Sequence, residues 1–89
     1  MEKIRISRTA IDEALFSLEK ALWQHGRSGK NAFEGVVWYI STARATTDFL
    51  NAFINLSSYR MNTLAGKIAK CGTAEDVVAV TKKYLKVTA

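Results

Sequence analysis

The 89-residue sequence contains no proline, one cysteine and one histidine. Proline is the residue that most strongly interrupts a helix, so its absence allows long helices whose ends are set by glycine. The single cysteine, Cys71, excludes an intrachain disulfide. Because proteins without disulfides are typical of reducing compartments, we expect a cytoplasmic protein.

Long hydrophobic runs are also missing. The longest uninterrupted apolar run is Val36–Ile40, far shorter than the roughly 20 residues that a membrane-spanning helix needs. Met1–Arg5 lacks the apolar core of a signal peptide. The alternation of Ile4 and Ile6 with basic residues predicts an extended arm or a lead-in to the first helix. We therefore expect no transmembrane insertion.

Side chains suited to catalysis or metal binding are few and dispersed. His25 stands beside Gly26 at a predicted helix end. Cys71 falls on an apolar position of a heptad pattern, where we expect a small buried side chain. One histidine and one cysteine far apart do not make a metal site. The acidic pairs Asp12–Glu13 and Glu75–Asp76 lie where helices are expected to begin. Carboxylates at that position interact favourably with the positive end of the helix dipole. The sequence predicts neither an enzyme nor a cofactor.

An apolar heptad pattern runs from Phe33 to Cys71. Steps of seven from Phe33 and from Val36 interleave as the a and d positions of a helix seam. This pattern predicts one long helix over about residues 30–71, roughly 60 Å long at about 1.5 Å per residue. The predicted association seam consists of Phe33, Val36, Ile40, Leu50, Ile54, Met61, Leu64 and Ile68.

Two shorter helices are expected at the ends of the long one. An apolar stripe with steps of four, three and four predicts the first, over about residues 8–25: Ile11, Leu15, Leu18 and Leu22. Gly72 as a stop and Thr73 as a cap predict the last, over about residues 74–87. We expect a single all-α domain of three helices over residues 1–89. The shorter helices would pack antiparallel at each end of the long one, in a coiled-coil or bundle oligomer.

A second apolar face follows the far side of the predicted long helix: Trp38, Phe49, Phe53, Leu56 and Tyr59. Each large side chain left in water forfeits about 1.5–3 kcal/mol of burial. Because the flanking helices are too short to cover two faces, this second face is predicted to contact another chain or an apolar surface. The first helix carries a narrower stripe of its own, Phe16 and Trp23.

The chain is basic, with a formal charge of +5 from 13 basic and 8 acidic residues. The basic residues are spread over the chain, except for a small candidate anion-binding patch of Lys82, Lys83 and Lys86 around Tyr84. This charge allows nucleic-acid binding. A helix-turn-helix, however, needs two short helices across a tight turn, and the pattern predicts a very long helix before Gly72.

A family resemblance rests on the segment from residue 49 to residue 85, about 40% of the chain. Its features are, in order, the mid-helix residues Phe49, Phe53 and Arg60, the stretch Lys67–Cys71, the break Gly72–Thr73, the acidic start Glu75–Val78 and the close Lys83–Leu85. The segment resembles the central part of phasins, small helical proteins that coat polyhydroxyalkanoate storage granules in bacteria. The resemblance implies self-association and contact with an apolar polymer surface.

Three functions are therefore open. The first is a non-enzymatic, self-associating protein that coats an apolar granule surface as phasins do. The second is a small helical adaptor that binds a protein partner through the exposed face of the long helix. The third is a basic helical protein that binds nucleic acid.

Overall fold

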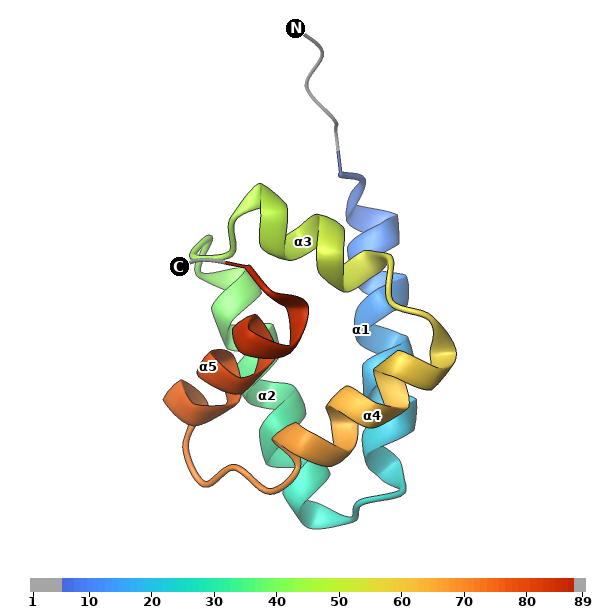
Figure 1. Ribbon diagram of the computed structural model, residues 1–89, viewed down its shortest axis with the longest axis vertical. Coiled ribbons are helices and arrows are strands. Elements are labelled where there is room, and N and C mark those ends of the chain that lie inside the picture. The colour runs from blue at the N-terminus through green and yellow to red at the C-terminus, as the bar shows by residue number, and fades with distance from the viewer. Residues whose placement is uncertain (1–5, 88–89) are drawn as a thin grey trace, which may run out of the picture.

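Five helices make up the computed structural model, which describes residues 6–87. They are α1 (Arg8–Trp23), α2 (Arg27–Ser41), α3 (Thr47–Ile54), α4 (Ser58–Ile68) and α5 (Ala74–Leu85) (Figure 1). No strand occurs within this range. Residues 1–5, which hold most of the predicted arm, lie outside it. The Cα radius of gyration is 12.2 Å, close to the value of about 12 Å for a compact domain of this length.

The prediction of three helices is wrong. The long helix expected over residues 30–71 is divided into α2, α3 and α4 by breaks at residues 42–46 and 55–57. As a result, the seam and the second face do not lie along one straight helix. The central helices are turned relative to one another, as Figure 1 shows for α3 and α4, and each packs on other helices of the same chain.

The first break is set by threonines and one left-handed residue. The Thr42 hydroxyl donates to the carbonyl oxygen of Trp38 at 3.0 Å, a bond within the last turn of α2. Ala43 follows at φ 59°, which ends the helical path. Thr46 then caps α3, because its hydroxyl accepts the N–H of Phe49 at 3.1 Å.

The second break has the same chemistry. The Asn55 side-chain amide donates to the carbonyl oxygen of Asn51 at 2.7 Å. The Ser57 hydroxyl accepts the N–H of Arg60 at 3.3 Å and so caps α4. Side chains that bond to their own backbone compete with a continuous helix. Here they satisfy part of each new helix end.

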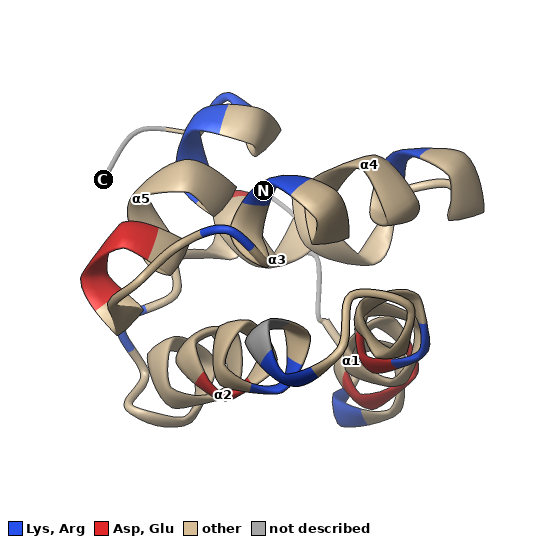
Figure 2. Ribbon diagram, turned by 90° about the horizontal axis from the view of Figure 1, so that it is seen from below, with Lys and Arg blue, Asp and Glu red and all other residues tan. Residues whose placement is uncertain are grey.

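The helices form two layers. Figure 2 shows α1 and α2 in one layer and α3, α4 and α5 in the other. α1 contacts both α3 and α4, and α5 contacts α2, so the core lies between the layers. Its most deeply buried large side chains are Phe49, Phe53, Leu18, Leu22, Leu64, Ile68 and Val36.

Glycine shapes the corner between α1 and α2. Gly26 adopts φ 72° and ψ −146°, a backbone conformation that is essentially restricted to glycine. Gly29 is buried against α1, where an added Cβ would collide with the carbonyl oxygen of Leu22. These two positions let α2 turn back beside α1.

Three aromatic rings join the layers. The rings of Tyr39 on α2 and Phe49 on α3 meet edge to face, with centroids 5.0 Å apart. Phe49 and Phe53 lie 6.1 Å apart between centroids on the same face of α3. Within residues 6–87, no helix has the length and apolar character needed to cross a membrane.

We expect Phe53→Ala to lower the free energy of unfolding by about 3–5 kcal/mol, because Phe53 is fully buried and its removal leaves a cavity. Tyr59→Ala is the matched control. Its side chain is 79% exposed, so its removal should change stability by no more than about 0.5 kcal/mol. Urea denaturation followed by circular dichroism measures both. Equal effects of the two substitutions would contradict the core position of Phe53.

Candidate anion-binding groove

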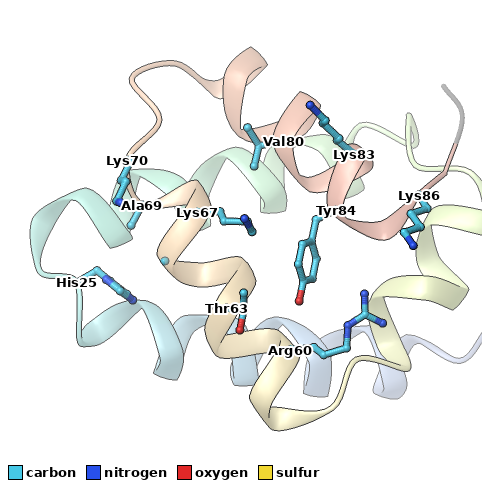
Figure 3. A pocket seen from close by; sticks show the side chains of 11 residues that line it. His25, Arg60, Thr63, Lys67, Ala69, Lys70, Val80, Lys83, Tyr84 and Lys86 are labelled. Carbon is cyan, nitrogen blue, oxygen red and sulfur yellow. The ribbon is translucent and has the colours of Figure 1, made fainter.

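An open groove of about 1030 Å³ lies between α4 and α5. One end is closed by a residue from the turn between α1 and α2, as Figure 3 shows. The groove is lined by His25, Arg60, Thr63, Gly66, Lys67, Ala69, Lys70, Val80, Lys83, Tyr84 and Lys86. Five of these residues are lysine or arginine and none is acidic. The groove is therefore a concentrated positive surface.

The wall from α4 follows from helical spacing. Arg60, Thr63 and Lys67 are separated by three and four residues, which places them on one side of α4, and Lys70 follows just after the cap of that helix. The opposite side of α4 is the core side, where Leu64 and Ile68 are buried. Sequence reasoning did not group Arg60, Lys67 and Lys70. Their common spacing was the signal for the wall.

The wall from α5 contributes Lys83, Tyr84 and, just beyond the helix end, Lys86. Tyr84 is half-buried, and its ring projects toward α4 (Figure 3). The Arg60 guanidinium carbon lies 5.1 Å from the centre of that ring, within the range of a cation–π contact. This contact joins the two walls.

The closed end is formed by His25 and Gly66. The Cε1 atom of His25 lies 3.6 Å from the position that a Cβ on Gly66 would occupy. That distance is an ordinary van der Waals contact, so the imidazole packs beside Gly66 on α4. The turn between α1 and α2 thus reaches the end of the groove.

Charge is distributed unequally between the two layers. Residues 8–41, which contain α1 and α2, hold four basic and four acidic residues. Residues 42–87, which contain the other three helices, hold seven basic and three acidic residues. The excess positive charge of the described chain therefore belongs to the layer that forms the groove.

The structure separates the three lysines of the predicted patch. Lys83 and Lys86 line the groove with the α4 cations. Lys82 instead has its Nζ 5.3 Å from the centre of the Tyr39 ring on α2. Two of the three thus belong to a larger basic surface that the linear sequence did not delimit.

The predicted association seam lies in or against the chain's own core. Val36, Met61, Leu64 and Ile68 are buried. The half-buried remainder packs against them: Phe33, Ile40, Leu50 and Ile54. Because these side chains contact other helices of the same chain, they do not form a continuous seam on the surface.

The second face does not form either, because it required the continuous helix. Phe49 and Phe53 are core residues, and Leu56 packs at the core's edge. Trp38 and Tyr59 are exposed, but they lie on α2 and α4 respectively. The five residues therefore do not share one surface.

The thiol of Cys71 is a poor nucleophile. Burial raises its pKa, and the negative charge of Asp76 raises it further. A raised pKa leaves less thiolate at neutral pH. Among the residues that the structure describes, no three histidine, cysteine or acidic side chains are grouped so that they could hold a metal ion.

The rate of alkylation of Cys71 by iodoacetamide should reach half its maximum at a pH above the ordinary cysteine pKa of about 8.5. The reason is that alkylation follows the thiolate fraction. Asp76→Asn should move that midpoint down part of the way, since burial, the larger cause, remains. The chain unfolded in urea provides the reference. A native midpoint at or below that of the unfolded chain would contradict the assignment.

Comparison with known proteins finds no matching family model, curated protein or solved structure. The resemblance to phasins over residues 49–85 therefore stays a prediction.

Proposed function

We propose that this chain is a non-enzymatic binding protein whose basic groove holds a single strand of nucleic acid. The observation that carries the proposal is the gathering of five cationic side chains along one open groove without a carboxylate. Lysine and arginine contacts to phosphates supply most of the affinity in sequence-independent nucleic-acid binding.

The size of the groove suits a short stretch of strand. From Arg60 to its end at Ile68, α4 extends about 12 Å at about 1.5 Å per residue. That length corresponds to three or four nucleotides at the roughly 3.4 Å rise of a base-stacked strand. Several phosphates can therefore lie along the row of α4 cations.

Tyr84 favours a nucleic acid over other polyanions. Proteins that bind single strands combine a positive groove with aromatic rings on which bases stack. The Tyr84 ring lies between the two rows of cations and is already in contact with Arg60. An acidic peptide would use the cations but gain nothing comparable from the ring.

A helix-turn-helix is not the basis of this proposal. The break at residues 55–57 does place two short helices, α3 and α4, across a tight turn. However, α3 packs on α1 and α5, while α4 packs on α1, α2 and α5, so the two helices do not pack on each other. The phosphate-binding surface is instead the α4–α5 groove.

Fluorescence anisotropy with a labelled 12-nucleotide oligo(dT) tests the proposal. For a single strand, the logarithm of the association constant falls with the logarithm of the salt concentration, with a slope of about −0.7 per phosphate contact. With about four contacts, the affinity should therefore fall about 50-fold between 50 and 200 mM salt. Lys67→Ala/Lys83→Ala should make the slope shallower by about 1.4. Arg8→Ala/Arg27→Ala, which removes the same charge from the other layer, is the matched control.

Three outcomes contradict the proposal. One is the absence of binding at low ionic strength, and another is an equal effect of the two double variants. The third is equal affinity for polyglutamate with the same number of charges, because that polymer cannot stack on Tyr84. Circular dichroism of each variant excludes unfolding as the cause.

Phasin-like coating of an apolar granule by a self-associating cytoplasmic protein is the second candidate. The observation that favours it is the exposure of Phe16, Trp23, Trp38 and Tyr59. If it is right, the chain should co-sediment with polyhydroxybutyrate particles. Binding should persist at 1 M salt, where the Debye length is about 3 Å. Loss of binding at that salt, or no binding at all, would contradict it.

A further inference from the structure

A second hollow adjoins the basic groove at Arg60. It has a volume of about 400 Å³ and lies between α3, the start of α4 and the end of α5. Arg60 lines both the groove and this hollow, and it stands toward the end of the groove opposite His25 (Figure 3). Leu85 lines the hollow and the next residue, Lys86, lines the groove. A strand that follows the groove past Arg60 therefore enters the hollow.

The α3 wall of this hollow is polar. Asp48 and Asn51 are three residues apart on α3, and Asn55 follows four residues later as the cap of that helix. This spacing places the three side chains on one side of the helix. The rest of the hollow, apart from Arg60, is apolar and consists of Ala52, Leu56 and Leu85. The hollow therefore combines apolar surface with one carboxylate and two amides.

The Asp48 carboxylate takes part in no ion pair within residues 6–87, where the one ion pair joins Arg8 and Asp12. Arg44, four residues before Asp48, instead has its guanidinium carbon 5.4 Å from the centre of the Trp38 ring. A carboxylate at this place repels phosphates. Because an ionised carboxylate only accepts hydrogen bonds, it suits a part of the ligand that brings N–H donors.

Guanine is the base whose donors match a carboxylate best. Its Watson–Crick edge carries N1–H and N2–H side by side, so both can donate to the two oxygens of one carboxylate. Cytosine and adenine place an acceptor ring nitrogen beside their amino group. Thymine has a single N–H between two carbonyl oxygens, which a carboxylate would repel. The O6 atom of guanine remains as an acceptor for an asparagine amide.

We propose that the hollow takes a guanine base of the strand, with Asp48 accepting from N1–H and N2–H and the Asn51 amide donating to O6. The Asn55 amide already donates to the carbonyl oxygen of Asn51. Arg60 then contacts the phosphate between this nucleotide and the one stacked on Tyr84. A volume of about 400 Å³ lies within the range of small-molecule sites. The inference rests on the proposed function, because the groove must hold the strand that delivers the base.

Two alternating strands test the base preference by fluorescence anisotropy at 50 mM salt, (dT-dG)6 and (dT-dI)6. Hypoxanthine, the base of dI, lacks only the N2 amino group of guanine, so purine stacking is the same in both strands. A bidentate base contact discriminates by roughly fivefold or more, and half of the binding registers place the purine in the hollow, so (dT-dG)6 should bind about threefold more tightly or better.

Asp48→Ala should abolish this difference, because the carboxylate that accepts from the N2 amino group is gone. Its affinity for oligo(dT) should be unchanged or slightly higher, since one negative charge is lost. Glu75→Ala is the matched control, because it removes an acidic residue from the first turn of α5 as Asp48→Ala does from that of α3. It should keep the preference for guanine. Circular dichroism shows whether each variant is folded.

Equal binding of the two alternating strands by the unmodified chain would overturn the inference, as would a preference for hypoxanthine. Persistence of the guanine preference in Asp48→Ala would overturn it as well. If oligo(dT) binds with the expected salt dependence but guanine is not preferred, the guanine site is wrong and the groove stands. If none of the three oligonucleotides binds, both proposals are wrong.

Discussion

The contact of Phe49 with Tyr39 and Phe53 is the constraint on which this fold depends. It requires the chain to leave the axis of α2 after Ser41 and return as α3 with both phenylalanines turned inward. Burying each phenylalanine contributes about 1.5–3 kcal/mol. Against this, each break forfeits backbone hydrogen bonds at two helix ends. Thr46 and Ser57 offset part of that loss as caps worth about 1 kcal/mol each.

The groove is a consequence of the same folding back. Once α4 is a separate helix, its inner side packs on α1 and its outer side faces α5. The cations of α4 and α5 repel one another, so their proximity is maintained by apolar packing beneath them, with Leu64, Ile68 and Val77 buried. A surface that assembles like charges at the expense of repulsion is suited to an anionic ligand, which removes the repulsion when it binds.

Helical character could be predicted from the sequence, but the number of helices could not. The apolar spacing of Phe33, Val36 and Ile40 is the same for a long seam as for a short helix packed on its own chain. Ser57 lies three steps of seven after Val36, so the heptad spacing places it on the seam, but the structure shows it as the cap of α4. Lys83 and Lys86 were visible as a local cluster, whereas Arg60, Lys67 and Lys70 join them only through tertiary packing. The spacing of apolar residues predicts which side chains share a helix face. It does not predict where the helix breaks, and the breaks determine which helices pack together.

The division of charge between the layers has a further consequence for the groove. The α1–α2 layer is electrically balanced, while the groove draws its cations from the other layer. The positive potential is therefore strongest on one side of the molecule, and an anionic strand approaching from solution is drawn to that side. Because the same cations line the groove, the long-range attraction and the phosphate contacts act on the same stretch of strand, and both weaken as the salt concentration is raised.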